Sequence, residues 1–305
     1  MTNIKSVSTK LSLVLIGASC VLSSASIADE IHQPHTAKAG DKWVLIEELS
    51  DEFAIRDMEK WNFKPESFGV WTWDDQNAVV EDGILKLTAV HEEHTRKFWD
   101  GCNKKPVDDF PLYFKSGMAK SKATGVYGYY EAKVKGADLH PGVSPAFWLY
   151  SAFDRTLKED GEVQYSEIDV VELQQESDDV FHSDHNLHNV IVENGKPKWM
   201  RPKPFAETNQ NTHKLDFDPR KEFAIYAVNV TPEDITWYVN GEQVGYKKNL
   251  YWHRDMNVAL SLGMRGDQFT RWDCNQFYPV DLKGEHGLPT TMEVEYIRAW
   301  KLADK

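Results

Sequence analysis

The chain has 305 residues, with 35 lysine and arginine against 48 aspartate and glutamate side chains, which gives a formal net charge of −13. That length allows one large domain or two small ones. The acidity excludes general nucleic-acid binding and favours a soluble exported protein, so an anionic polymer would have to be attracted by a few local cations. Aromatic residues make up 12% of the chain, with 11 tryptophans, which is typical both of sugar-stacking surfaces and of β-sandwich cores.

Residues 1–28 are predicted to be a secretory signal peptide. Lys5 and Lys10 supply a positive start, residues 11–22 form an apolar segment, and residues 26–28 form a small-x-small cleavage site. The apolar segment is too short and too rich in Ser, Gly and Ala to cross a membrane. We therefore expect a secreted or periplasmic protein that makes no membrane contact once the signal peptide is removed.

The remainder is predicted to be a short polar lead, residues 29–40, followed by a single domain, residues 41–305. No internal repeat, linker or change in composition follows residue 40. Runs of β-branched and aromatic residues with alternating polarity predict strands, and Asn240-Gly241 suits the type I′ turn of a hairpin. No segment has the pattern of an amphipathic helix. The strands are expected at residues 42–46, 84–90, 126–136, 143–150, 166–172, 186–192, 222–230, 235–239, 242–244, 256–263 and 291–300.

Such a set of strands predicts an all-β fold, an antiparallel β-sandwich whose concave face could line a cleft for an extended polymer. The strand at residues 126–136 alternates well, so we expect it to be half-buried, with Tyr129 and Glu131 on its solvent side. Residues 91–111 are polar and too many for a typical hairpin turn, so we expect a long binding loop there.

Two cysteines remain once Cys20 leaves with the signal peptide. Cys102 and Cys274 form an even pair in an exported chain, for which a disulfide bond is the usual outcome. The alternative is a pair of buried free thiols.

The segment Ser166–Glu172 carries three carboxylates, at Glu167, Asp169 and Glu172, separated by Ile and Val. Its β-branched residues predict a strand. Because side chains alternate along a strand, Glu167 and Asp169 would share one face and Glu172 would lie on the other. A β-bulge between Asp169 and Glu172 would return Glu172 to the face of the other two acids.

Three acids in a row on one face repel each other, which is poor design for a purely structural strand. The arrangement suits glycoside hydrolysis, because a retaining enzyme needs a carboxylate nucleophile and a carboxylic acid about 5–5.5 Å apart. At least one of three close carboxyl groups should have a raised pKa and could donate a proton near neutral pH. The alternative is an edge strand whose solvated acidic face prevents aggregation.

The six residues from Glu167 to Glu172 match the active-site signature of glycoside hydrolase family 16 in its bulged-strand form. The resemblance implies a concave jelly-roll sandwich and endo-acting cleavage with retention of configuration. It assigns the nucleophile to Glu167 and the acid/base to Glu172, with Asp169 between them to orient the nucleophile and modulate its charge. Across residues 42–300 the chain resembles the bacterial κ-carrageenases of that family, in the blocks 98–103, 127–132, 141–148, 163–166, 251–254 and 274–279.

Several further side chains are candidates for substrate binding. The resemblance places Trp148 beneath the sugar next to the cleavage point. It places Arg265 on a sulfate group of the sugar that the nucleophile attacks, where a guanidinium can pair two oxygens at once. A core position for Trp148 and a surface salt bridge for Arg265 are the alternatives. One of Trp71 and Trp73 is expected to face the cleft, and Trp71 is favoured.

Trp199 and Arg201 form a second candidate pair, for stacking and for sulfate binding. The family keeps a histidine near the acids, and His188 is favoured over His185 because it falls inside an alternating strand. A structural role is the alternative for either histidine. No cluster has the spacing of a zinc site, and no cofactor is expected. Some relatives bind a structural calcium ion on the convex face, but no pattern in this sequence marks its ligands.

The sequence therefore predicts a monomeric endo-acting hydrolase that cuts the β-1,4 bonds of κ-carrageenan, a sulfated galactan. Residues 266–271, just after Arg265, depart from the κ-carrageenase pattern. This departure keeps related galactans open as substrates, namely β-carrageenan, furcellaran hybrids, agar or porphyran. A non-catalytic glycan-binding sandwich is a further alternative, and the presence of all three acids argues against it.

Overall fold

The computed structural model describes residues 32–175, 178–282 and 286–303, and the residues from Pro34 onward form one compact unit. The predicted signal peptide, residues 1–28, lies outside the described residues. Within the described ranges, no helix has the length and apolar character needed to span a membrane.

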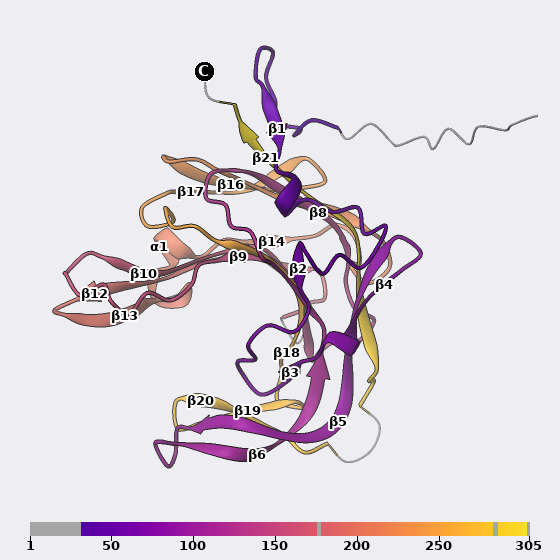
Figure 1. The fold of residues 1–305 in the computed structure, drawn as a ribbon, viewed down its shortest axis with the longest axis vertical. Helices are drawn as coiled ribbons and strands as arrows, with labels where there is room; N and C mark the ends of the chain where they lie inside the picture. The colour runs from indigo at the N-terminus through magenta and orange to yellow at the C-terminus, as the bar shows by residue number, and fades with distance from the viewer. Residues whose placement is uncertain (1–31, 176–177, 283–285, 304–305) are drawn as a thin grey trace, which may run out of the picture. The chain divides into compact units, whose positions relative to one another are not determined.

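Two stacked, mainly antiparallel sheets make up this unit (Figure 1), which confirms the predicted all-β sandwich of the jelly-roll type. In spatial order, the first sheet contains β17 (Glu242–Lys248), β16 (Asp234–Val239), β15 (Ala224–Val230), β8 (Gly128–Lys135), β21 (Thr290–Leu302), β5 (Ile84–Asp100), β6 (Lys105–Ser116) and β3 (Thr72–Trp73). Strand β1 (Trp43–Leu45) pairs with β21, and β4 (Ala78–Glu81) pairs with β5. The short pairing of β3 with β6 is parallel.

The second sheet carries the acidic segment near its middle. Its spatial order is β13 (Lys196–Met200), β12 (Leu187–Glu193), β10 (Val163–Leu173), β9 (Val143–Tyr150), β18 (Asn257–Met264), β7 (Met118–Ser121) and β2 (Trp61–Asn62), with β11 (His182–Asp184) on β10 and β14 (Thr212–Lys214) on β11. A separate hairpin contains β19 (Thr270–Asp273) and β20 (Gln276–Pro279). The helical elements are short, namely η1 (Glu47–Leu49), η2 (Asp75–Asn77), η3 (Lys203–Phe205) and α1 (Ala206–Asn209).

The predicted strands are all present, with ends that shift by a few residues or, for β5, extend further. The predicted hairpin is formed by β16 and β17. Its two turn residues, Asn240 and Gly241, have φ angles of 47° and 82°, as the type I′ turn requires.

One expectation is wrong, because residues 91–111 form a hairpin and not a long loop. Strand β5 continues to Asp100, and β6 begins at Lys105. This part of β5 extends past the sandwich core, and most of its side chains are at least partly exposed, although Phe98 and Asp100 are buried. A strand that extends beyond the main core needs no long apolar alternation, so its sequence looks like that of a loop.

The expectation of a solvent face on β8 is also wrong. Tyr129 and Glu131 are 1% and 2% exposed. Tyr129 packs edge-on against Trp43 of β1 and contacts Trp300 of β21. Its hydroxyl also lies 2.8 Å from Nδ1 of His35, in the predicted polar lead. The alternation of apolar and polar residues correctly predicts that β8 is a strand. It does not reveal that β1 and the residues before it cover the face of β8 that carries Tyr129.

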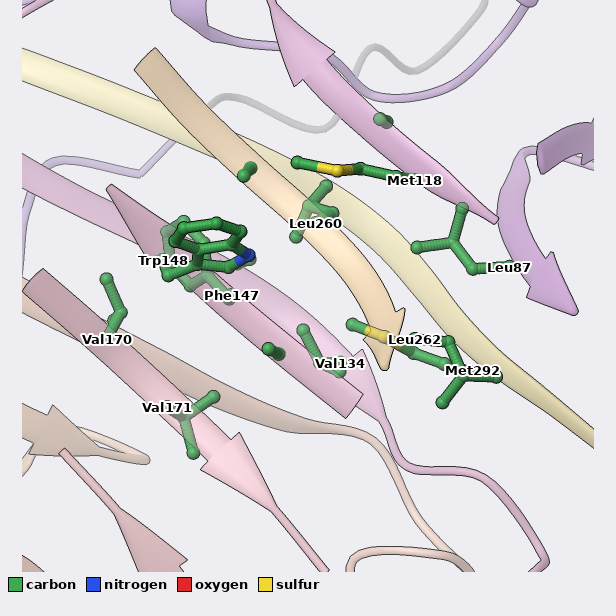
Figure 2. Packing of buried hydrophobic residues seen from close by; sticks show 14 of the residues in the cluster. Leu87, Met118, Val134, Phe147, Trp148, Val170, Val171, Leu260, Leu262 and Met292 are labelled. Carbon is green, nitrogen blue, oxygen red and sulfur yellow. The ribbon is translucent and has the colours of Figure 1, made fainter. Parts of the chain in front are cut away.

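The core lies between the two sheets (Figure 2). The first sheet contributes Leu87, Val134 and Met292, and the second contributes Phe147 and Leu260, each at most 1% exposed. Burying one such side chain stabilises the fold by about 1.5–3 kcal/mol. This packing fixes which face of the second sheet points inward, and therefore which face remains for the acidic side chains.

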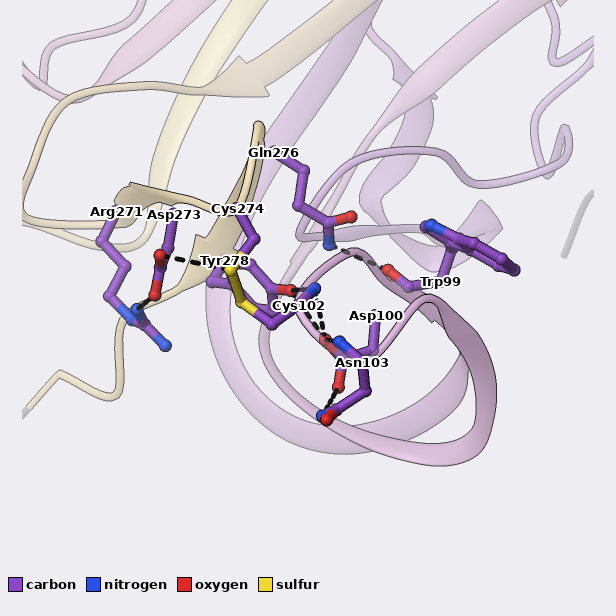
Figure 3. Close-up of a disulfide and its surroundings, with 9 residues drawn as sticks. All are labelled: Trp99, Asp100, Cys102, Asn103, Arg271, Asp273, Cys274, Gln276 and Tyr278. Carbon is purple, nitrogen blue, oxygen red and sulfur yellow. Dashed lines mark hydrogen bonds and ion pairs between the residues drawn. A yellow bond between two sulfur atoms is a disulfide. The ribbon is translucent and has the colours of Figure 1, made fainter.

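The predicted disulfide bond is present. It joins Cys102, in the turn between β5 and β6, to Cys274, in the turn between β19 and β20 (Figure 3). The two cysteines are 172 residues apart in sequence, so the bond ties together two hairpins that are distant along the chain.

Candidate active site

Strand β10 places the three acids on one face by means of a β-bulge. In its pairing with β9, Asp169 lies opposite Trp148, and the register shifts before Val171, so that Val170 is an extra residue. Val170 and Val171 are both fully buried. Glu172, one residue beyond them, therefore returns to the concave face with Glu167 and Asp169, as predicted.

The bulge is held by donors that come from the core. The carbonyl of Val170 lies 2.6 Å from Nδ1 of His185, and because a carbonyl only accepts, Nδ1 must carry the hydrogen. The indole of Trp237, from the opposite sheet, donates to the carbonyl of Asp169 at 2.9 Å. The indole of Trp252 donates to the carbonyl of Glu167 at 2.8 Å. The carbonyls of Asp169 and Val170, which lie at the bulge, thus have side-chain donors.

His185 is a buried neutral side chain and does not reach the acids. It is 0% exposed, and its Nε2 lies 3.0 Å from the hydroxyl of Ser183. Burial lowers the pKa of His185 to about 4, and the hydrogen bond to the Val170 carbonyl opposes that only in part. The histidine not favoured by the sequence thus supports the backbone under the acids.

His188, the favoured histidine, lies beside the acids. Its Nε2 is 3.3 Å from Oδ2 of Asp169 and 3.7 Å from Oε1 of Glu167. Burial alone would lower the pKa of His188, but the neighbouring carboxylates Glu167, Asp169 and Glu172 raise it to about 9. His188 therefore carries a positive charge at neutral pH and balances part of the acidic cluster.

The two acids beyond Glu167 bind protons more tightly than free carboxyl groups. Burial raises the pKa of Asp169 well above its usual range, and the charges of Glu172 and Glu167 raise it further. Burial also raises the pKa of Glu172, although the charges of Arg265 and His188 pull it down. A pair of this kind can hold a proton at neutral pH and donate it to a nearby oxygen.

Glu167 has a partner that the sequence did not single out. The hydroxyl of Tyr165, two residues earlier on the same face of β10, donates a hydrogen bond to Oε2 of Glu167. Burial and the charge of Glu167 raise the pKa of Tyr165 well above its usual value, so the phenol stays protonated. The Tyr165 donor and the His188 cation both stabilise negative charge on Glu167.

A pocket of about 120 Å³ lies over the acids. Strands β9, β10 and β18 form its floor, and the segment before and within β3 forms one wall. Its lining residues are Phe68, Trp71, Trp73, Ser144, Ala146, Trp148, Glu167, Asp169, Glu172, Ser261, Gly263 and Arg265.

Trp148 lines the pocket and, at 9% exposed, also belongs to the buried hydrophobic cluster shown in Figure 2. Its indole donates to Oγ of Ser261 at 3.1 Å and is stacked on Tyr150 at 4.3 Å. Trp71 and Trp73 both line the pocket, and their rings meet edge to face at 5.5 Å. The expectation that only one of them faces the cleft is therefore wrong. Four aromatic rings next to carboxyl groups form a surface suited to sugar rings.

Arg265 enters the same pocket. One of its Nη atoms is 3.3 Å from Oε1 of Glu172, and its guanidinium lies over the ring of Trp71 at 5.8 Å. The expected alternative of a surface salt bridge therefore does not apply, because the carboxyl partner is a member of the acidic cluster. The Arg265 side chain is 36% exposed, so it can also reach a bound anion.

Trp199 and Arg201 lie outside this pocket, at the β13 edge of the same sheet. The Arg201 guanidinium is 4.6 Å from the Trp199 ring, which is within cation–π range. Trp199 is 43% exposed, and its ring contacts that of Tyr165 at 5.5 Å. The pair is thus connected to the acids through Tyr165, the partner of Glu167.

Arg96 is a further residue that the sequence did not reveal. Its guanidinium donates to the carbonyls of Gly69 and Trp71 and to the hydroxyl of Thr72. These bonds fix the segment that carries Trp71 into the pocket. The sequence gives no indication of this role, because Arg96 lies in the polar stretch for which a loop is expected.

One group near the acids has the composition of a metal site. Ligand atoms of Glu167, Asp169 and His188 all lie within 4.8 Å of one another. Because a histidine must lose its proton to bind a metal, the raised pKa of His188 opposes metal binding here. The group fits a network of acids around one cation better than a metal centre.

Comparison with known proteins gives one family. Residues 43–302 match a family model described as the GH16 domain of β-porphyranases A–D. A kappa-carrageenase from Pseudoalteromonas carrageenovora is 58% identical over 280 residues, which cover 92% of this chain and 70% of that protein.

Solved structures agree with this match. A crystal structure of the kappa-carrageenase from Pseudoalteromonas carrageenovora in complex with an oligotetrasaccharide of kappa-carrageenan is 57% identical, has a TM-score of 0.86, and covers 89% of this chain and 99% of that one. A second structure is named a 1,3-α-1,4-β-D-galactose-4-sulfate-3,6-anhydro-D-galactose 4 galactohydrolase. It is 58% identical, with a TM-score of 0.86 and coverage of 89% of this chain and 100% of that one.

The hydrogen bond from His185 to the carbonyl of Val170, which we call the bulge clamp, leads to a first prediction. His185→Leu should lower kcat by about 100-fold, because a shift of 1 Å in a catalytic group costs about that much. KM should change little, since Trp148 and Arg265 stay in place. His185→Asn keeps an N–H donor near the position of Nδ1 and should restore much of kcat. His213→Leu, a substitution on neighbouring β14, is the matched control. A folded His185→Leu variant with kcat within two-fold of wild type would contradict the clamp.

The His188 charge makes a second prediction, on stability against pH. The folded-state pKa of about 9 is above the usual 6.5, so the protonated histidine stabilises the fold fully below pH 6.5 and loses that contribution as pH rises through about 9. His188→Gln should therefore reduce the free energy of unfolding by about 2–3 kcal/mol more at pH 6.5 than at pH 10. Denaturant titrations at both values measure this, and equal losses at the two pH values would rule the ion pairs out as its source.

Proposed function

The chain belongs to glycoside hydrolase family 16, and from that premise we propose that it is a secreted, endo-acting, retaining enzyme that cleaves the β-1,4 linkages of κ-carrageenan. The observation that carries the proposal is the bulged strand β10, which turns Glu167, Asp169 and Glu172 into one aromatic-lined pocket. The choice of substrate is supported by kappa-carrageenases that are 57–58% identical to the chain.

We assign the first step to Glu167 and Glu172 together. Glu167 attacks the anomeric carbon and forms a glycosyl-enzyme bond, while Glu172, whose pKa is raised, gives its proton to the departing glycosidic oxygen. In the second step, Glu172 takes a proton from water, and that water displaces Glu167 from the sugar. Configuration at the anomeric carbon is inverted twice and is therefore retained.

Asp169 and His188 serve Glu167 in this scheme. Asp169 lies between the two reacting acids, and its raised pKa allows it to hold a proton that it can share with a neighbouring carboxylate. The positive charge of His188 stabilises Glu167 both before attack and when it leaves the sugar. Tyr165 donates to the same carboxylate and holds it in one orientation.

Arg265 gives the site a way to couple sulfate binding to proton donation. Its guanidinium contacts Glu172, and its charge lowers the pKa of that acid. A galactose sulfate in the pocket would compete for the guanidinium and draw it away from Glu172. The pKa of Glu172 would then rise further, so the acid would be better protonated when the correct substrate is present.

A second candidate substrate is porphyran, another sulfated galactan. The family model that matches residues 43–302 is that of β-porphyranases. The segment 266–271 follows Arg265, and it is there that we expect preference among galactans to be set. Reducing-end assays on κ-carrageenan, β-carrageenan, furcellaran, agar and porphyran, followed by product identification, separate these candidates.

Export and metal independence are part of the proposal. Expression with the natural leader should release a protein that lacks residues 1–28, as N-terminal sequencing of the secreted form would detect. Activity should persist in the presence of a chelator, because the acids and His188 need no metal in this scheme. A loss of activity that calcium restores would instead indicate the structural calcium ion found in some relatives.

The role assignment predicts that Glu167→Ala and Glu172→Ala each abolish hydrolysis of κ-carrageenan while the fold stays intact. Asp169→Asn should lose much of the activity. Reducing-end assays and circular dichroism of the purified variants provide the measurement. Near-wild-type turnover by either alanine variant would overturn the assignment.

The sulfate role predicts that Arg265→Ala lowers kcat/KM on κ-carrageenan far more than on a desulfated analogue. On that analogue, the alkaline limb of the pH–rate profile should move to higher pH, because the Arg265 charge no longer lowers the pKa of Glu172. Arg265→Lys is the control that keeps the charge without the planar fork. Equal losses on the two substrates would count against sulfate recognition by Arg265.

A further inference from the structure

Two hairpins pack face to face beyond the sandwich core. On the β5–β6 hairpin, Phe98 and Phe110 stack at 4.5 Å. Tyr278 of β20 lies 6.0 Å and 6.3 Å from their two rings. The guanidinium of Arg271 on β19 covers the Tyr278 ring at 5.0 Å, so Arg271 and Tyr278 belong to the packed face of the β19–β20 hairpin.

A disulfide bond and hydrogen bonds join the two hairpins at their turns (Figure 3). The Cys102–Cys274 disulfide joins the two turns, and the hydroxyl of Tyr278 donates to Asp100 at 2.8 Å. The side chain of Gln276 donates to the carbonyl of Trp99 at 2.8 Å. A covalent bond and two hydrogen bonds between distant segments give the small β19–β20 hairpin a fixed position.

The other face of the β19–β20 hairpin carries two large aromatic side chains in the open. Trp272 and Phe277 are cross-strand partners, and alternation along each strand places them opposite the packed face of Arg271 and Tyr278. They are 62% and 51% exposed, and their rings meet edge to face at 4.9 Å. An exposed pair of aromatic side chains that is held in a fixed position is typical of a binding surface.

We propose that Trp272 and Phe277 form a platform that binds sugar rings of the sulfated galactan chain outside the acid pocket. The proposal rests on the proposed function and adds a contact to it. Aromatic faces bind the apolar C–H face of a pyranose ring, and a ring held by a fixed hairpin loses little conformational entropy on binding.

The platform is continuous along the chain with the pocket. Strand β18 ends at Met264, Arg265 reaches into the pocket, and β19 begins at Thr270. Phe269, just before β19, is fully buried and contacts Phe114 edge to face, so it anchors the connection. In Figure 1, the β12–β13 hairpin and the β19–β20 hairpin both extend toward the left of the view, and the β19–β20 hairpin lies next to the β5–β6 hairpin.

The charge of the double hairpin suits an anionic chain. Residues 96–109 and 270–279 carry five cationic and four acidic side chains, a net charge of +1 in a chain of −13. Two of the acids, Asp108 and Asp273, form ion pairs with Lys97 and Arg271, respectively. Lys104 at the turn is exposed beside the disulfide. This end of the molecule therefore repels a sulfated polymer less than the overall acidity implies.

Binding to κ-carrageenan can be measured in a Glu167→Gln background, which prevents turnover. Trp272→Ala should weaken binding of the polymer by about 3- to 10-fold, as expected for the loss of one aromatic stacking contact. Binding of a tetrasaccharide, which offers fewer sugar rings outside the pocket than the polymer does, should weaken less. Phe277→Ala should have a smaller effect in the same direction.

Trp99→Ala is the matched control. Trp99 lies on β5 and is 57% exposed. Because its neighbour Phe98 faces the β19–β20 hairpin, Trp99 lies on the opposite face of the β5–β6 hairpin, away from Trp272 and Phe277. The platform is overturned if Trp272→Ala and Trp99→Ala have equal effects, or if Trp272→Ala binds the polymer as tightly as the parent. A parent that does not bind κ-carrageenan, together with a wild-type enzyme that does not cleave it, would overturn the proposed function as well. Melting temperatures of all variants confirm that they are folded.

Discussion

One extra residue in strand β10 decides where the acids point. Without the bulge at Val170, alternation would send Glu172 toward the core, where an isolated charge is very costly. With it, all three acids share the concave face, and both valines stay buried. The bulge in turn depends on core donors, since His185 and Trp237 bind the carbonyls that the strand ladder leaves unpaired. Catalytic geometry and core packing are therefore parts of one arrangement.

The second constraint is electrostatic. Three carboxyl groups in one pocket are tolerated because two of them bind protons more tightly and because His188 and Arg265 bring positive charge to the cluster. The same balance divides the chemical work. Tyr165 and His188 contact Glu167, whereas burial raises the pKa of Glu172. In the proposed mechanism, a sulfated substrate shifts this balance through Arg265 and so couples recognition of the polymer to its cleavage.

Much of the fold and of the acidic site could be predicted from the sequence, and each wrong or missing prediction has a physical cause. The acidic segment predicted the bulge, because only a bulge places all three acids on one face. The cysteine pairing was predicted from the even number of cysteines and the expected export. The choice between His185 and His188 rested on alternation and was sound, but the support that His185 gives to the bulge depends on tertiary contacts. Tyr165 and Arg96 act through contacts that sequence spacing does not reveal. The β5–β6 hairpin looked like a loop because it extends past the sandwich core, where only a few side chains such as Phe98 and Phe110 pack against the β19–β20 hairpin.

The central claim is that one bulged strand supplies both the nucleophile and the acid of a double displacement. An activated 2-fluoro glycoside of a κ-carrageenan oligosaccharide tests it most directly, because the fluorine slows the second step and lets the glycosyl-enzyme accumulate. Mass spectrometry of the digested protein should find the sugar on Glu167, and a Glu172→Gln variant should still be labelled when the leaving group needs no proton. A label on Glu172, or the absence of any label on an enzyme that the reagent inactivates, would contradict the account.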